Sequence, residues 1–237
     1  MLQTGAEFAI IRSKICTEKK LNVEPSELKP YRTVSAASET EYVVNRSRFI
    51  GRCFPVTDEQ EALQILERIR KQHWDATHNC FAYRLKSGAA RYSDDGEPQG
   101  TAGLPMMEVL KKRDLYDLLV VSTRYFGGIL LGAGGLVRAY TRSASEAVDA
   151  AGLVSMEPCT TFSVRIAYPY RNAVWSVFER FGVIETTDYG EKITCTFRCR
   201  SNDTDAFLKA LSDRTEGRVG AEAIDEGYFG FPITEQN

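Results

Sequence analysis

The sequence of 237 residues has no hydrophobic run that approaches the roughly 18 residues needed to cross a membrane. Its first residues also lack the apolar core, followed by small residues, that marks a secretory signal. The six cysteines are scattered without a Cys-x-x-Cys pair, which favours reduced, buried thiols over a disulfide framework. We therefore expect a cytoplasmic protein with no membrane partner.

A surplus of basic residues is missing as well. The chain has 30 Lys and Arg against 32 Asp and Glu, and the two signs are equal in number between Glu41 and Glu157. Proteins that bind duplex nucleic acid usually have a clear basic surplus. Any contact with nucleic acid would therefore have to be a local patch.

The standard nucleotide-binding loops are also absent. A Walker loop ends in Gly-Lys-Ser or Gly-Lys-Thr, and the chain contains neither. A dinucleotide fingerprint counted from Gly132 would need Gly or Ala where Val137 stands.

The composition that is present, 43% hydrophobic and 26% charged, is typical of a soluble globular protein. Hydrophobic periodicity and turn residues predict alternating strands and helices through the first part of the chain. The predicted elements are strands at 42–44 and 48–56 around a turn at 45–47, a helix at 59–72 opened by a Thr57/Gln60 or Asp58/Glu61 capping box, a strand at 79–85, a helix at 105–112, a buried strand at 117–123 and a helix at 135–151.

The last third of the chain has a different order of elements. Strands are predicted at 162–167, 183–188, 192–200 and 218–226, with helices at 170–181 and from the Asn202 or Asp203 cap to 214. This βαββαβ order is that of the ferredoxin-like fold, with four antiparallel strands and two helices on one face. We expect an N-terminal extension over 1–40, with a short helix or strand at 8–15, a first domain over 41–157, a second over 158–230 and a tail over 231–237.

The most unusual stretch is RYFGGILLGAGGLVR, from Arg124 to Arg138. Glycines allow positive φ angles or the close approach of another group, and a helix that begins here would offer free amides to an anion. Packing of the helix against the preceding strand is the alternative explanation. The candidate anion or polar-ligand residues are Arg124, Tyr125, Gly127, Gly128, Gly132, Gly134, Gly135 and Arg138.

A second candidate is the acidic loop that begins at Ser93. Its carboxylates, Asp94, Asp95 and Glu97, could hold Mg²⁺ or act as a general base, or could instead bond the amides of a turn. The small residues from Gly100 and Thr101 to Gly103 follow them, and this loop could face the glycine stretch across a cleft.

His73, His78 and Cys80 form a third group. Their spacing matches no standard zinc site, so a buried thiol and two capping or core histidines are the favoured interpretation. Tyr125 and Phe126 could stack on bases, although aromatic residues at a strand end are more often part of a core.

Four motifs in order give the chain a resemblance to the IMPACT/YigZ family: Ser47–Ile50, His78–Tyr83, Ser93–Pro105 and Val120–Tyr140. A bacterial member is expected, since no RWD-type domain precedes the motifs. The resemblance implies an α+β protein whose first domain is like a small-subunit ribosomal protein and domain IV of elongation factor G. It implies a second, ferredoxin-like domain like domain V of that factor. Eukaryotic members are linked to translational control through a protein partner that activates a stress kinase.

Our leading hypothesis is a translation-associated regulatory protein that binds RNA, the ribosome or a ribosome-associated partner, without catalytic residues, metal or cofactor. The expected surface combines Arg124, the glycines, Arg138 and Arg142 with the loop from Ser93 to Thr101. The alternative is an enzyme acting on a phosphorylated small molecule or nucleotide, with phosphate at the glycine-rich helix start. A third hypothesis is an adaptor in which both loops only pack.

Overall fold

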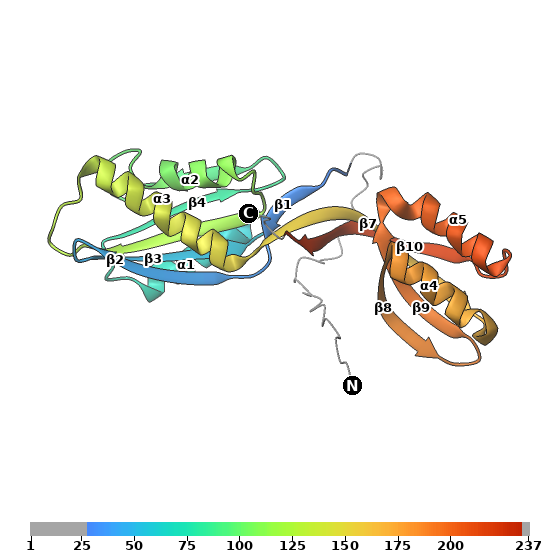
Figure 1. Ribbon diagram of the computed structural model, residues 1–237. Coiled ribbons are helices and arrows are strands. Elements are labelled where there is room, and N and C mark those ends of the chain that lie inside the picture. The colour runs from blue at the N-terminus through green and yellow to red at the C-terminus, as the bar shows by residue number, and fades with distance from the viewer. Residues whose placement is uncertain (1–27, 234–237) are drawn as a thin grey trace, which may run out of the picture. The chain divides into compact units, whose positions relative to one another are not determined.

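The computed structural model describes residues 28–233, so the segment predicted at 8–15 lies outside the described residues. The chain divides into two compact units. In the described part the first comprises Tyr31–Ser155 with residues 232–233, and the second comprises residues 28–30 with Met156–Phe231. The described residues form a mixed α and β protein with two five-stranded sheets and five α-helices (Figure 1). None of these helices is both long enough and apolar enough to span a membrane.

The first unit is built on an antiparallel sheet with the strand order β2-β3-β6-β4-β5. The bounds of these strands are β2 (Ser38–Val44), β3 (Ser47–Pro55), β6 (Leu118–Tyr125), β4 (His78–Arg84) and β5 (Ala90–Ser93). The register of β6 sets Arg124 beside Phe49 on one neighbour and beside His78 on the other. Arg124, the first residue of the glycine stretch, therefore lies on the central strand of the sheet.

Helices cover both faces of this sheet. On one face α1 (Glu59–Gln72) packs Leu66 and Ile69 in a cluster with Leu119 and Val121 of β6. On the other face α2 (Gly103–Lys112) and α3 (Gly132–Ala151) pack with Leu118 and Val120 (Figure 1). The alternation along β6 confirms the prediction of a strand buried on both faces.

The second unit contains the predicted order of elements. Its sheet runs β10-β7-β9-β8, and β1 is a further neighbour of β7, which begins in the first unit. Its core is aromatic, with Phe178 stacked on Phe197 and both near Phe207. The remaining bounds are β1 (Tyr31–Val34), β7 (Leu153–Ile166), α4 (Arg171–Phe181), β8 (Gly182–Tyr189), β9 (Ile193–Arg200), α5 (Thr204–Thr215) and β10 (Ala221–Pro232), with 3-10 turns at Tyr168–Tyr170 and Ser201–Asp203.

Several boundaries differ from those predicted. The edge strand β5 was not predicted, because its short, exposed sequence carries no apolar alternation. β1 and the start of β2 lie in residues assigned to an irregular extension. Helices α2 and α3 begin at Gly103 and Gly132, two and three residues before the predicted starts, 105 and 135, because glycine is a poor helix former and its presence predicts loop.

The start of α1 is where local sequence and structure agree best. The helix has the predicted bounds, and Asp58 is its N-cap, accepting the Glu61 N–H at 2.8 Å. The Glu61 carboxylate in turn accepts the N–H of Thr57 at 3.0 Å. Of the two capping boxes left open by the sequence, the Asp58/Glu61 box is the one that forms.

Candidate functional site

The glycine-rich connection between β6 and α3 lies against the β2–β3 turn. A Cβ added at Gly127 would lie 2.0 Å from the carbonyl carbon of Arg46, so only glycine allows the two backbones to approach this closely. Gly128 and Gly132 have φ angles of +81° and +68°, which favour glycine for a different reason. The connection is therefore shaped by both of the properties that glycine offers.

The first turn of α3 has no side-chain cap. Its N-cap, Leu131, makes no side-chain hydrogen bond, and the first turn contains no acidic residue. Gly132 and Gly134 are exposed, and a Cβ at Gly134 would lie 3.5 Å from the Nη1 atom of Arg138. The amides of this turn are thus left without intrahelical partners, beside an exposed arginine.

Arg124 is buried rather than presented at the surface. Its Nη1 donates to the Glu97 carboxylate at 2.6 Å, and its Nη2 donates to the Ser47 hydroxyl at 3.2 Å. The guanidinium also faces the rings of Phe49 and Phe126. Its Nε is buried with no hydrogen-bond partner among the described residues. Arg124 therefore has a structural role and holds neighbouring segments of the site together.

Glu97 is the centre of this buried cluster. Besides Arg124, its Oε1 accepts the hydroxyl of Tyr140 at 2.7 Å and lies 3.7 Å from His78 Nε2. Burial raises the pKa of Tyr140, and so do the neighbouring Cys80 and Glu97. His78 Nδ1 donates to the Asp95 carbonyl at 2.8 Å, which fixes the orientation of the ring. The cluster joins the acidic loop to β4, β6 and α3.

The other two carboxylates of the acidic loop are bonded to local amides, as in the turn interpretation. Asp94 accepts the N–H groups of Gly100, Ala102 and Gly103 at 2.8–3.0 Å. Asp95 accepts the N–H of Asn79 at 2.7 Å and pairs with Arg70 at 3.3 Å. The described residues contain no group of three His, Cys, Asp or Glu side chains arranged to hold a metal ion.

Small residues complete the acidic loop. The Thr101 hydroxyl donates to the Pro98 carbonyl at 2.7 Å, and Ser93 Oγ accepts the N–H of Asp95 at 3.2 Å. Gly100 has a φ angle of +76°, and a Cβ at Gly103 would meet the backbone of Ser93 at 2.7 Å. Contacts among its own residues therefore fix the conformation of the acidic loop, separately from its contact with the glycine stretch.

Cys80 lies beside the cluster with a protonated thiol. Burial raises its pKa to about 12, and its Sγ donates to the Asp94 carbonyl at 2.9 Å. The thiolate needed for a nucleophile or a metal ligand is therefore disfavoured. A buried structural cysteine is the interpretation that the sequence favoured.

Tyr125 belongs to a separate hydrogen-bond chain on the opposite side of β6 from Arg124. Arg52 Nη2 donates to His73 Nε2 at 2.7 Å, and His73 Nδ1 then donates to the Tyr125 oxygen at 2.8 Å. Tyr125 donates onward to Asp75 at 3.3 Å. Burial, followed by the charge of Arg52, lowers the pKa of His73. His73 is also the C-cap of α1, one of the roles expected from the sequence.

The structure thus divides the candidate residues into three groups. Arg124, Glu97, Asp94 and Asp95 are engaged in internal contacts, and Tyr125 joins the chain through His73. Gly132, Gly134 and Arg138 lie at the exposed helix start. The sequence did not single out Ser47 and Tyr140 as members of the cluster. Both fall inside the family motifs, but their roles depend on contacts between segments more than 40 residues apart.

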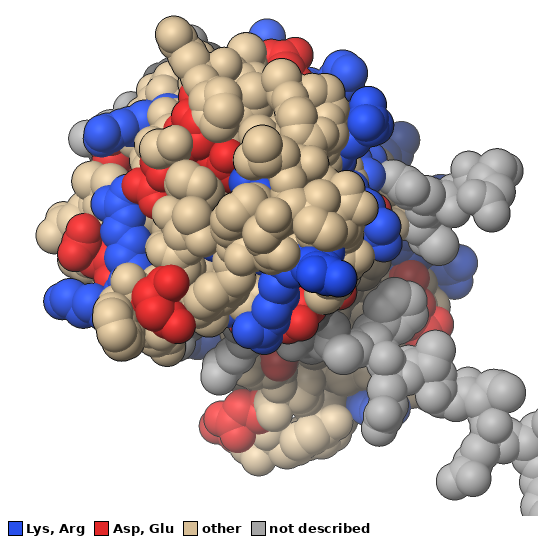
Figure 2. All heavy atoms as spheres, turned by 90° about the vertical axis from the view of Figure 1, so that its left-hand side faces the viewer, with Lys and Arg blue, Asp and Glu red and all other residues tan. Residues whose placement is uncertain are grey.

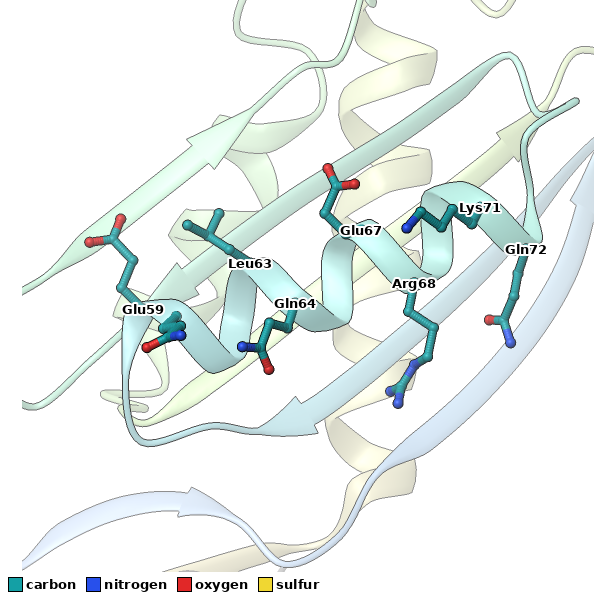
Figure 3. A pocket seen from close by; sticks show the side chains of 8 residues that line it. Glu59, Leu63, Gln64, Glu67, Arg68, Lys71 and Gln72 are labelled. Atoms are coloured by element: carbon teal, nitrogen blue, oxygen red, sulfur yellow. The ribbon is translucent and has the colours of Figure 1, made fainter.

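A depression on the outer face of α1 is separate from these groups. Figure 3 shows its lining side chains, which extend from that helix alone and are polar apart from Leu63. None of the candidate residues lines it, and we assign it no role.

Comparison with known proteins agrees with the motifs. The model of the Impact N-terminal domain matches residues 45–148, and a domain of unknown function matches residues 173–218. The chain is 41% identical to the IMPACT family member YvyE of Bacillus subtilis, over 81% of this chain and 89% of that protein. It is 30% identical to the IMPACT family member YigZ of Escherichia coli, over 77% of this chain and 92% of that protein.

A solved structure resembles this fold. The crystal structure of a hypothetical protein, 28% identical, matches with a TM-score of 0.54 and covers 84% of this chain and 98% of its own. The motifs and the domain match agree with the relatives, which this chain matches over most of their length. The chain belongs to the IMPACT family.

Proposed function

We propose that this protein is a non-catalytic, translation-associated regulator that binds the ribosome, its RNA or a ribosome-associated partner through the end of the first unit where β6 meets α3. The observation that carries the proposal is that the buried and the exposed parts of the site have different roles. The buried cluster around Glu97 and Arg124 fixes the two loops, while the uncapped helix start and Arg138 stay exposed. Such an arrangement supports binding rather than proton transfer.

The engaged state of the carboxylates favours this role over the alternative of an enzyme acting on a phosphorylated molecule. Both oxygens of Asp94 accept backbone amides, and Glu97 is paired with Arg124. A general base needs a lone pair within reach of its substrate. The carboxylates of this site instead hold the loops together.

The architecture supports a link to translation. We assign the first unit to the fold shared by a small-subunit ribosomal protein and domain IV of elongation factor G. We assign the second unit to a ferredoxin-like domain like domain V of that factor, an assignment supported by the sheet order β10-β7-β9-β8. These assignments are fold-level analogies, so the function depends on the surface. They also make the cytoplasm the expected location.

The test is a salt-dependent binding assay with purified ribosomes and structured RNA. Arg138→Glu is the informative variant, because Arg138 is exposed, whereas replacing Arg124 would disturb the buried pair. Arg214→Glu, on an exposed position of α5, is the matched control for charge. We expect Arg138→Glu to weaken binding and to reduce its dependence on salt, because one contact with an anionic group of the partner is lost. Absence of wild-type binding to ribosomes and to RNA at physiological salt would refute the proposal.

A further inference from the structure

Four exposed apolar residues of the first unit lie in the connection between β6 and α3 and on the first turns of α3. Leu130 is 84% exposed, Phe126 46% and Ile129 42%, and Val137 on the first turns of α3 is 38% exposed. Figure 2 faces the end of the first unit where this connection lies, and it shows a broad uncharged area with charged side chains mainly around its margin. We call residues 126–131 the apolar loop.

The apolar loop is held in an outward position by its ends. The Phe126 N–H is bonded to the Thr77 hydroxyl at 3.0 Å, and the Gly127 N–H to Ser47 Oγ at 3.2 Å. Gly127 also packs on the backbone of Arg46, and α3 begins directly after the loop. Ile129 and Leu130 therefore project from a fixed base, which lowers the entropy cost of docking them.

The chemistry of the apolar loop favours a protein partner. Aliphatic side chains such as Ile129 and Leu130 offer bases neither a ring to stack on nor a hydrogen bond. A membrane would need a second signal, such as a basic surplus, and basic and acidic residues are equal in number between Glu41 and Glu157. An apolar groove on a protein is the remaining environment that would bury these side chains.

Two arginines next to the apolar loop indicate the rim of that groove. Arg46 lies in the β2–β3 turn against Gly127, and Arg138 lies beside Gly134. Both are exposed, and neither forms an ion pair with another described residue. Carboxylates at the edge of the partner's groove would complement them.

Resting on the proposed function, we infer that the apolar loop is the anchor by which this protein docks into an apolar, acid-rimmed groove of a protein of the ribosome or of a factor bound to it. Leu130 and Ile129 enter the groove, and Arg46 and Arg138 pair at its rim. The uncapped helix start lies at the edge of the contact.

The experiment measures dissociation constants of the full chain for unwashed ribosomes, salt-washed ribosomes, protein-free ribosomal RNA and phosphatidylglycerol vesicles. The variants are Ile129→Ser/Leu130→Ser and the matched control Ile224→Ser, which removes an exposed apolar side chain from β10 of the second unit. All three side chains are exposed, so the unfolding midpoints should stay unchanged. We expect the double variant to bind ribosomes about tenfold more weakly or worse, with an unchanged salt slope, while the control binds as the wild type.

Four outcomes would overturn the inference. Wild-type affinity of the double variant for ribosomes would remove the apolar loop from the contact while leaving the proposed function standing. An equal loss of affinity for protein-free RNA would identify RNA as the ligand. Binding of the wild type to phosphatidylglycerol vesicles that the double variant loses would identify a membrane. Failure of the wild type to bind ribosomes at all would refute the proposed function and the inference together.

Discussion

Glu97 neutralises Arg124 in a place where both side chains are almost fully buried. Glu97→Gln would leave the guanidinium charged and without an anionic partner, which should lower the free energy of unfolding by about 3–5 kcal/mol. Glu67→Gln is the control, because Glu67 pairs with Arg70 on the surface and its loss should cost less than about 1 kcal/mol. Urea unfolding measures both. Equal losses in the two variants would contradict a structural role for the buried pair.

A second test of the same pair removes both partners. Glu97→Met/Arg124→Met replaces two buried charges with apolar side chains of similar length, so we expect it to be more stable than Glu97→Gln alone. A double variant less stable than the single one would show that the hydrogen bonds to Tyr140 and Ser47 matter more than the charge balance.

His73 should make stability depend on pH. Folding lowers its pKa below the ordinary value of 6.5, so the unfolded chain binds the proton first as the pH falls. The contribution is fully present above about pH 6.5 and is lost as the pH falls through the lowered folded pKa. The charged and titratable groups near the ring are Arg52, Arg48, Tyr125, Asp75 and Glu39.

An NMR titration measures this directly, because the chain contains only two histidines. We expect the resonance of His73 to titrate below pH 6.5, and we expect His73→Gln to lose less stability than the wild type between about pH 7.5 and about pH 5.5. A His73 pKa at or above 6.5 would show that the chain from Arg52 to Tyr125 does not hold the ring neutral.

At the scale of elements, the connection between β6 and α3 separates two roles of glycine. Gly127→Ala should cost at least about 2 kcal/mol, because its Cβ would overlap the backbone of Arg46. The Cβ of Gly128→Ala would lie in open space, so only the positive φ angle opposes the substitution. It should lower the free energy of unfolding by about 1 kcal/mol. Thermal or urea unfolding of the two variants should rank them in this order. The opposite order would mean that the β2–β3 turn moves aside easily.

The sequence predicted elements well wherever a local pattern determined them. The bounds of α1 follow from its capping box and its apolar stripe, and the burial of β6 follows from its unbroken apolar run. The sequence places the beginnings of α2 and α3 too late because glycine is a poor helix former, and at Gly103 the requirement for glycine comes from a distant neighbour, the backbone of Ser93. The burial of Arg124 could not be predicted for the same reason, since its partner Glu97 is 27 residues away.

At the scale of the whole molecule, each unit has a core of its own. Phe207 is fully buried among Phe162, Phe178 and Phe197 in the second unit, so Phe207→Ala should destabilise that unit by about 3–5 kcal/mol. Hydrogen exchange measured by mass spectrometry should show lost protection in peptides from Met156–Phe231 and retained protection in those from Tyr31–Ser155. Equal loss in both would show that the two cores unfold as one.

The Asp95–Gly96 bond has a consequence for how the protein ages. Aspartate before glycine tends to cyclise, because the following amide nitrogen attacks the side-chain carbonyl carbon, and the resulting imide reopens mostly as isoaspartate. In this fold the Asp95 carboxylate is held by the Asn79 N–H and by Arg70, away from that attack. The amount of isoaspartate that accumulates at Asp95 during storage would therefore report how often the acidic loop opens.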